Sequence, residues 1–127
     1  MDNTTTKQPD ILIVDDIFIN RMMLADILAS LGCRTTEAKN GEEALLLSQE
    51  RPFDMILMDL EMPVMNGIET TIAIRAQGGR NAIVPIVALT AHSADEIAAD
   101  LAAARFTDLL GKPFLTEKIQ RLLEIYC

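Results

Sequence analysis

The segment MILMDLEMPVMNG, residues 55–67, carries the strongest structural signal in the chain. Residues 55–58 form a short uninterrupted apolar run, which is typical of a strand buried on both faces of a parallel sheet. Asp59 ends this run, and Pro63 and Gly67 then favour a loop before the next apolar pattern begins. The segment therefore predicts a central strand that places one carboxylate at its carboxyl end.

The same pattern recurs on both sides of this segment. Short apolar or β-branched runs alternate with segments in which apolar residues return every three to four positions. The predicted strands cover residues 11–14, 35–38, 55–58, 84–89 and 108–110. Five helices are predicted. The first has Met23, Leu24, Ile27, Leu28 and Leu31 on its inward face and ends at Gly32, and the second is capped by Asn40. The third covers residues 68–76, the fourth begins with a capping box of Ser93 and Glu96, and the fifth covers residues 116–126. This alternation predicts an α/β domain with a five-stranded parallel sheet and helices on both faces.

Length and composition indicate one globular domain. The chain has 127 residues, of which 50% are hydrophobic and 24% charged, so it can bury a substantial core. Residues 1–9 lack periodicity and are expected to form a flexible tail, which leaves residues 10–127 as the folded domain.

The charge and the apolar runs limit the possible partners. The net charge of −8 argues against direct binding to nucleic acid. No apolar run approaches the ~20 residues that a bilayer requires, and the start of the chain has no signal-peptide pattern. We therefore expect a cytoplasmic protein that does not insert into a membrane.

The chain contains two cysteines and one histidine. They are too few for a disulfide framework or a tetrahedral zinc site, and a lone histidine argues against a nucleophile–histidine–acid triad. Cys33 has an apolar context typical of a core residue, and Cys127 is expected to be an exposed thiol. His92 has two open interpretations: a partly exposed residue at the entrance of the fourth helix, or a residue that tunes access of water.

Charged and hydroxyl side chains follow four of the predicted strands. Asp15 and Asp16 follow the first strand, Asp59 the third, Thr90 the fourth and Lys112 the fifth. The carboxyl ends of parallel strands form the crevice in which α/β proteins bind ligands. We therefore expect these side chains to converge on one edge of the sheet.

Three carboxylates crowded together require a counter-charge, because their mutual repulsion amounts to several kcal/mol at an effective dielectric constant of ~20. Oxygen ligands without a nearby cysteine or histidine pair favour Mg²⁺, with Mn²⁺ as a substitute. In such a site Asp59 can attack phosphorus to form an acyl phosphate. Lys112 would then pair with one phosphoryl oxygen, and the Thr90 hydroxyl would donate to another.

Four motifs in this order, ILIVDD at 11–16, MILMDLEMPVMNG at 55–67, PIVALTAH at 85–92 and KP at 112–113, resemble those of a receiver domain of a two-component response regulator. The resemblance covers about residues 10–125. It implies a doubly wound, flavodoxin-like (βα)5 fold.

The resemblance also implies roles for individual residues. Asp16, Asp59 and the backbone carbonyl of Glu61 would bind Mg²⁺, and Asp15 would act mainly through water. Asp59 would accept phosphate from a histidine, and Thr90 would be the switch hydroxyl. Lys112 would precede a cis peptide bond, which is accessible only because proline follows.

The segments Asn20-Arg21, MPVMNG and ALTAH are most similar to those in receivers of hybrid histidine kinases and phosphorelays. The implied partner is a histidine kinase or a histidine phosphotransfer domain, and the downstream protein effector is not indicated. The resemblance implies a domain that catalyses only its own phosphorylation and dephosphorylation. We expect a monomer, and the Met1 tail favours a stand-alone protein.

Three positions depart from the family pattern. Ile17 stands where that subgroup usually has asparagine, Arg105 where the family has a glycine before its fifth strand, and Leu109 where it has the switch aromatic. Leu109 puts the usual coupling between threonine and aromatic in doubt. The apolar residues 17–19 could be partner surface or core, and the sequence leaves both open.

Three other functions share parts of this pattern. A flavodoxin-type electron carrier needs hydroxyls and amides in its first loop, where this chain has two acids. A haloacid-dehalogenase-like phosphatase needs D-x-D after a single strand, whereas here the second acid follows a different strand. The third alternative is a receiver that works as a binding module without phosphorylation, which Leu109 and Arg105 would suit.

Overall fold

The computed structural model describes residues 8–127 except for the side chain of Ala94, so residues 1–7 of the expected tail lie outside the described residues. Pro9 already contacts the sheet, because its carbonyl accepts a hydrogen bond of 2.8 Å from the Arg34 N–H. No helix in the described part of the chain is long and apolar enough to cross a membrane.

Five parallel strands form one sheet in the order β2-β1-β3-β4-β5. The strands are β1 (Asp10–Val14), β2 (Arg34–Ala38), β3 (Met55–Asp59), β4 (Ile86–Thr90) and β5 (Asp108–Gly111). The predicted five-stranded parallel sheet is therefore confirmed.

The fourth strand starts later than expected. Residues 84 and 85 precede it, because the Val84 N–H donates to the Arg80 carbonyl (3.0 Å) next to the short helix η2 (Gly79–Ala82). Pro85 has no N–H to donate to the sheet, although its carbonyl accepts from the Ile56 N–H (2.8 Å). The apolar residues of this segment begin before the strand does, so the sequence pattern did not reveal where β4 starts.

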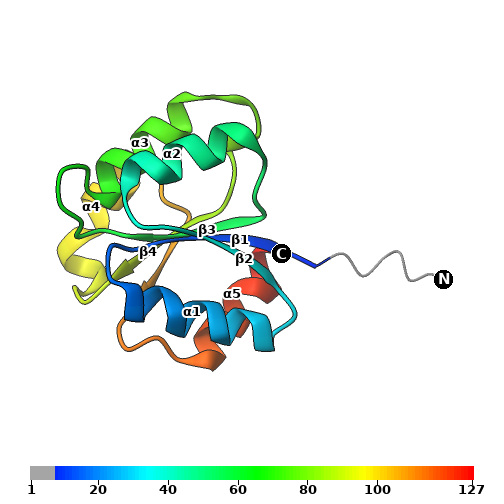
Figure 1. Ribbon diagram of the computed structural model, residues 1–127. Coiled ribbons are helices and arrows are strands. Elements are labelled where there is room, and N and C mark those ends of the chain that lie inside the picture. Colours follow the sequence, from blue (N-terminus) through cyan, green and yellow to red (C-terminus); the bar gives the residue numbers. More distant parts are fainter. Residues whose placement is uncertain (1–7) are drawn as a thin grey trace.

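Five helices cover the two faces of the sheet, as Figure 1 shows. They are α1 (Phe18–Ser30), α2 (Gly41–Glu50), α3 (Gly67–Ala76), α4 (Ala94–Ala104) and α5 (Thr116–Tyr126). α1 and α5 lie on one face, and α2, α3 and α4 lie on the other. The expected doubly wound architecture is thus confirmed.

Several predicted helix boundaries have the expected local chemistry. The Asn40 side chain accepts a hydrogen bond of 2.8 Å from the Glu43 N–H at the start of α2. Ser93 and Glu96 form the predicted capping box of α4. Gly32 follows α1 with φ +88°, a left-handed conformation in which glycine carries no steric penalty.

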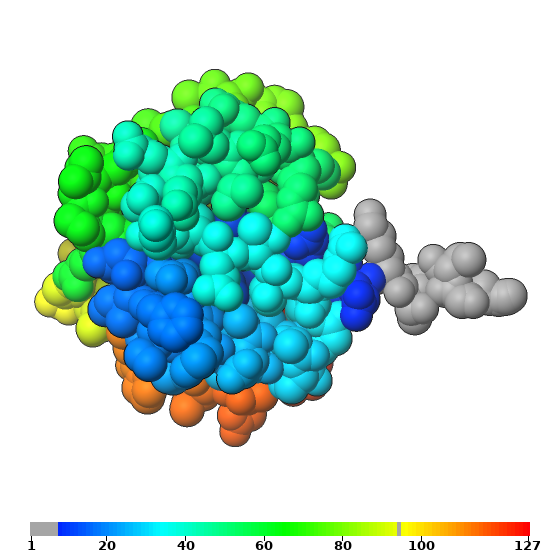
Figure 2. All heavy atoms as spheres, in the orientation of Figure 1, coloured from blue at the N-terminus to red at the C-terminus, as the bar shows by residue number. Residues whose placement is uncertain are grey.

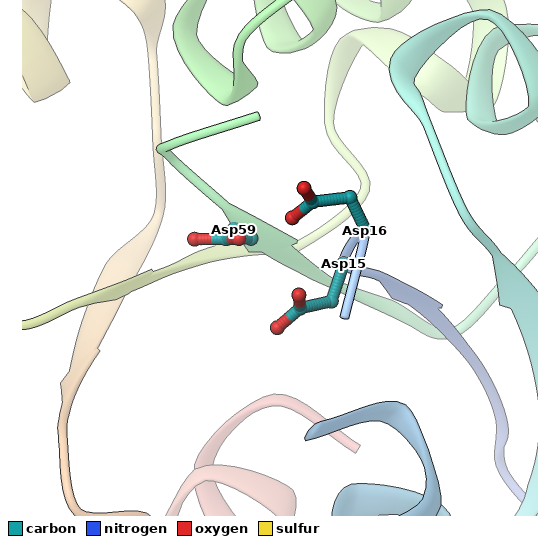
Figure 3. A group of neighbouring side chains, drawn as sticks. All are labelled: Asp15, Asp16 and Asp59. Carbon is teal, nitrogen blue, oxygen red and sulfur yellow. The ribbon is translucent and has the colours of Figure 1, made fainter. Parts of the chain in front are cut away.

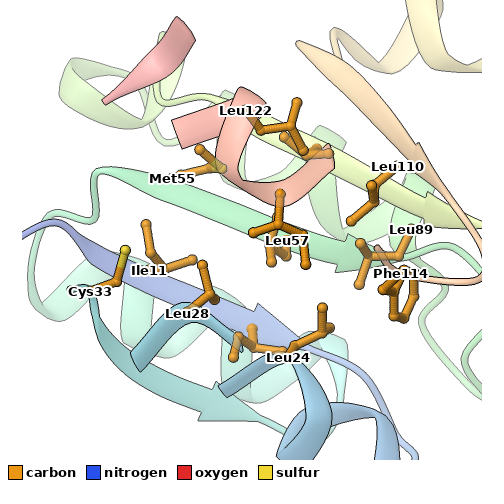
Figure 4. Close-up of a cluster of buried hydrophobic side chains, with 13 residues drawn as sticks. Ile11, Leu24, Leu28, Cys33, Met55, Leu57, Leu89, Leu110, Phe114 and Leu122 are labelled. Atoms are coloured by element: carbon orange, nitrogen blue, oxygen red, sulfur yellow. The ribbon is translucent and has the colours of Figure 1, made fainter. Parts of the chain in front are cut away.

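The core consists of apolar layers on the two sides of a sheet whose three central strands are fully buried. All five residues of β1, of β3 and of β4 are buried. Figure 4 shows one layer, in which Leu24 and Leu28 of α1 and Leu122 of α5 pack on β1, β3 and β4. The prediction that Met23 lies inward is wrong: it is 44% exposed, because the buried face of α1 is centred on Leu24 and Leu28.

The two cysteines lie where the sequence predicts. Cys33 is buried at 7% exposure in the layer beneath α1, and Cys127 is exposed.

Gly67 allows α3 to begin directly against the end of β3. A Cβ atom on Gly67 would lie 2.2 Å from the carbonyl oxygen of Asp59 and 2.8 Å from the Cα of Leu60. The Gly67 N–H also donates to the Leu60 carbonyl (3.1 Å). The close approach is therefore to backbone atoms, which cannot rotate away as a side chain can.

We predict that Gly67→Ala lowers the free energy of unfolding by about 2 kcal/mol, because it overpacks a backbone contact. Gly111→Ala is the matched control, since a Cβ at Gly111 meets no atom within 4 Å. Urea unfolding of both variants measures the difference. Equal stability of the two variants would contradict the proposed contact.

Candidate functional site

Asp15, Asp16 and Asp59 converge at the carboxyl edge of the sheet, as Figure 3 shows. One ligand atom of each carboxylate lies within 4.8 Å of one from each of the others. β1 and β3 are neighbours in the sheet, so the two acids after β1 come to lie beside the acid that ends β3. The expected cluster is therefore formed by strand pairing.

Asp15 is the most buried member of the cluster, with no exposed surface. Its Oδ1 accepts a hydrogen bond of 2.9 Å from the Ile17 N–H. Its Oδ2 is buried and has no hydrogen-bond partner among the described residues. Because an unpartnered buried carboxylate oxygen is costly, this atom fits a cation or a cation-bound water in the cluster.

Asp59 is 3% exposed, and its Oδ1 accepts a hydrogen bond of 3.3 Å from the Glu61 N–H. Burial, followed by the negative charge of Asp15, raises the pKa of Asp59 to about 6. The Glu61 N–H and the positive charge of Lys112 act in the opposite direction and lower this pKa. The dominant cost is thus the removal of a carboxylate from water beside a second acid, which a divalent cation would relieve.

Thr90 ends β4, the strand next to β3, and Lys112 follows β5, which pairs with β4 at the edge of the sheet. Thr90 is buried at the end of β4, and its Oγ1 accepts a hydrogen bond of 2.9 Å from the His92 N–H. The Lys112 N–H donates to the Thr90 carbonyl at 3.0 Å, which ties the loop after β5 to the end of β4. The Lys112–Pro113 bond is cis, as the resemblance to receiver domains implied.

The ammonium group of Lys112 contacts no carboxylate in the described residues. Its Nζ lies 5.9 Å from the centre of the Phe114 ring. Within residues 8–127 it forms no ion pair within 4.0 Å, so its influence on Asp59 acts through space. The cation is therefore available for an anionic group that enters the site.

The side chains of Glu61 and His92 form a pair that the sequence did not predict. His92 Nε2 lies 3.0 Å from Glu61 Oε2, and this pair joins the loops after β3 and β4. His92 is 46% exposed, consistent with its interpretation as a partly exposed residue at the entrance of α4. No local pattern signals this pair, because it depends on how two loops approach each other.

Two of the departures from the family pattern have clear structural positions. Arg105 follows α4 in the left-handed conformation, with φ +63°, at the position where the sequence comparison suggested a glycine. Leu109 is half-buried and packs on the cluster of Leu60, Ala88 and Leu101. Glycine would adopt the Arg105 conformation without steric cost, so Arg105 is held there by its surroundings.

The start of α1 forms an exposed apolar surface beside the carboxylates. Ile17, Phe18 and Ile19 are 50%, 61% and 54% exposed, so the structure places them on the surface and not in the core. Met22 and Met23 extend this surface, which we call the α1 apolar surface. The residues of α1 are blue in the space-filling view of Figure 2.

The sequence profile of the response regulator receiver domain matches residues 11–124. This chain belongs to that family. The receiver domain is 34% identical over 125 residues to hybrid signal transduction histidine kinase G of Dictyostelium discoideum, covering 97% of the chain and 4% of the relative. It is 35% identical over 115 residues to the sensor histidine kinase AruS of Pseudomonas aeruginosa, covering 90% of the chain and 12% of that relative. The chain thus spans a small part of both kinases.

Solved receiver structures have the same fold. The chemotaxis protein CheY4 of Vibrio cholerae superposes with a TM-score of 0.89 at 33% identity, over 95% of this chain and 100% of that chain. The receiver domain of the sensor histidine kinase PA1611 of Pseudomonas aeruginosa gives a TM-score of 0.86 at 34% identity, over 94% and 98% of the two chains. That structure holds a magnesium ion in its active-site cleft. The electron-carrier and dehalogenase alternatives are therefore set aside for a receiver domain of two-component systems.

We predict that the metal-free receiver domain loses stability as the pH rises through the pKa of Asp59. This pKa is about 6 in the folded protein against an ordinary value of 3.8, so the folded state keeps a proton that the unfolded state has lost. The stabilising proton is fully present below about pH 4 and is lost above about pH 6, which lowers the free energy of unfolding by about 3 kcal/mol.

Asp59→Asn removes this titration, so it should be the more stable protein at pH 7 in EDTA. Urea unfolding at pH 4 to 8 measures both proteins, and their difference isolates residue 59 from all other titrating groups. Parallel pH profiles of the two proteins would show that the pKa of Asp59 is the same in the folded and unfolded states.

Proposed function

We propose that this receiver domain accepts a phosphoryl group on Asp59 from the phosphohistidine of a histidine kinase or a histidine phosphotransfer domain, and so switches or relays a two-component signal. The observation that carries this proposal is the cluster of three carboxylates, of which Asp15 and Asp59 are buried and the Asp15 Oδ2 lacks a partner among the described residues. A purely structural acid cluster would be expected to satisfy that oxygen within the protein.

Asp15, Asp16 and Asp59, together with the backbone carbonyl of Glu61, would hold Mg²⁺, and Mn²⁺ fits the same oxygen ligands. The magnesium in the related PA1611 receiver supports this assignment. When bound, the ion neutralises charge on the carboxylates and on incoming phosphoryl oxygens. With the charge of Lys112 added, the three carboxylates are balanced before the phosphoryl group enters.

The transfer itself requires one nucleophile and two groups that hold the phosphoryl oxygens. An Asp59 carboxylate oxygen attacks phosphorus, the new O–P bond forms while the histidine N–P bond breaks, and the imidazole nitrogen keeps the electron pair. Lys112 pairs with one phosphoryl oxygen. The Thr90 Oγ1 already accepts the His92 N–H, so its own hydrogen is free to donate to another.

The reaction belongs to the domain itself, because the phosphoryl group is received and later lost at the same aspartate. We therefore propose no separate substrate and no enzymatic activity beyond phosphorylation and dephosphorylation of Asp59.

We also propose residues 10–127 as the receiver domain, preceded by a tail, and a monomer located in the cytoplasm. Its two free cysteines suit a reducing compartment.

We predict that incubation with acetyl phosphate and Mg²⁺ adds one phosphoryl group to the protein, and that Asp59→Asn abolishes this gain. Intact-mass measurement followed by peptide mapping detects the modification and its position. Omission of Mg²⁺ is the control for the cation. A wild-type protein that remains unlabelled would favour the alternative of a binding module that works without phosphorylation, and full labelling of Asp59→Asn would disprove the assignment of Asp59.

The α1 apolar surface is the proposed contact for the phosphodonor protein, because it lies at the rim of the carboxylate site and is exposed. We predict that Phe18→Ser slows phosphotransfer from a phosphorylated histidine phosphotransfer domain at least tenfold, since a buried aromatic anchor typically contributes 2 kcal/mol or more, which is roughly thirtyfold in affinity. Labelling by acetyl phosphate should stay unchanged, because this small donor needs no docking surface.

Ile83→Ser is the matched control, since Ile83 is 82% exposed and lies in the segment before β4, away from the carboxylates. Radioactive phosphotransfer assays measure both donors for both variants. Equal rates for Phe18→Ser and Ile83→Ser with the protein donor would place the docking surface elsewhere.

A further inference from the structure

Arg75, near the end of α3, is a buried cation whose hydrogen-bond partners are all neutral. The residue is 5% exposed, and no carboxylate in the described chain lies within 4.0 Å of its guanidinium group. Burial, and secondly the charge of Arg105, lower the pKa of Arg75. A buried charge without a counter-ion is costly, so the contacts that retain it must be extensive.

Those contacts join segments that are distant in the sequence. Nε and Nη2 both donate to the Arg105 carbonyl, at 3.1 and 2.9 Å. Nη1 donates to the carbonyls of Asn81 and Val84, at 3.1 and 2.5 Å, and Nη2 also donates to Thr107 Oγ1 at 3.3 Å. One side chain thus fastens the approach to β4 and the connection from α4 to β5.

The Arg105 carbonyl, which accepts two hydrogen bonds from Arg75, belongs to a residue with an unusual backbone conformation. Arg105 ends α4 in the left-handed conformation, at φ +63°, which costs a non-glycine residue about 1 kcal/mol. The two hydrogen bonds from Arg75 engage the backbone of this residue and not its side chain. The carboxyl end of α4 is therefore held at the residue where the chain turns toward β5.

The amino end of α4 is attached much more weakly. Within residues 95–100 only Ile97 is partly buried, whereas Leu101 and Ala104 near the carboxyl end are buried. The first turn is capped by its own Ser93 and Glu96. The preceding His92 connects this end to the rest of the site through the exposed pair with Glu61 and through its N–H, which donates to Thr90 Oγ1.

We propose that Arg75 is a positioning residue that fixes the carboxyl end of α4, so that a change at Thr90 turns the helix about Arg105 and does not shift it as a whole. The inference rests on the proposed function, because the change begins when Thr90 binds a phosphoryl group. The helix has 11 residues and is about 16 Å long, so a small rotation at Arg105 produces its largest displacement beside Thr90.

The test uses the full chain, with beryllofluoride and Mg²⁺ as the mimic of the phosphoryl group, and measures backbone amide chemical shifts. In the wild type we expect the largest changes over residues 90–97, falling at least fivefold by residues 104–107. Arg75→Lys keeps a charge but cannot bridge the same acceptors. In this variant we expect changes at residues 104–107 to rise to at least half of those at residues 90–97.

Arg105→Gly is the control, because it keeps the carbonyl that accepts from Arg75 and should retain the wild-type pattern. A purely structural role of Arg75 would lower stability without redistributing the shift changes. If Arg75→Lys does not fold, the wild-type profile and the Arg105→Gly profile still decide, because uniform changes along α4 in either protein overturn the inference. Absence of any change at Asp59 and Thr90 overturns the proposed function as well, whereas uniform changes along α4 leave it standing.

Discussion

The repulsion between carboxylates buried at the ends of β1 and β3 is the constraint on which the functional edge of this domain depends. Asp15 and Asp59 are both buried, and their proximity contributes to the raised pKa of Asp59. The cost is tolerated because the backbone holds both residues in place: Asp59 pairs with Leu89 of β4, and the Asp15 N–H donates to the Ala38 carbonyl at 3.1 Å. A divalent cation between these carboxylates would offset their repulsion, so metal binding would be linked to the stability of the edge.

The central strands supply the rigidity that this arrangement requires. β1, β3 and β4 are buried throughout, with helices on both faces of the sheet, so their ends cannot move independently. The candidate functional groups lie at the carboxyl ends of these strands, where the chain leaves the packed core. Gly67 completes the edge, because only a residue without Cβ fits against the Asp59 carbonyl.

Two elements beside β4, the loop after β5 and the helix α4, differ in how firmly they are held. On one side the loop after β5 is tied to β4 through the Lys112 N–H and the Thr90 carbonyl. On the other side α4 is fastened by Arg75 at one end and is mostly exposed at the other. A rigid phosphoacceptor edge next to a partly held helix is the arrangement expected of a domain that converts a local charge change into a change of surface.

The sequence by itself determined the sheet, the helix order and the acids and hydroxyl that end the strands, because apolar periodicity and strand-end position are local properties. It also placed Cys33 in the core, and the resemblance of its motifs to receiver domains implied the cis bond at Pro113. Only the tertiary structure decided the exposure of Met23, the late start of β4, the pair of Glu61 and His92, and the partners of Arg75. These features depend on contacts between segments far apart in the chain, whose geometry is set by packing and leaves no periodic trace in the sequence.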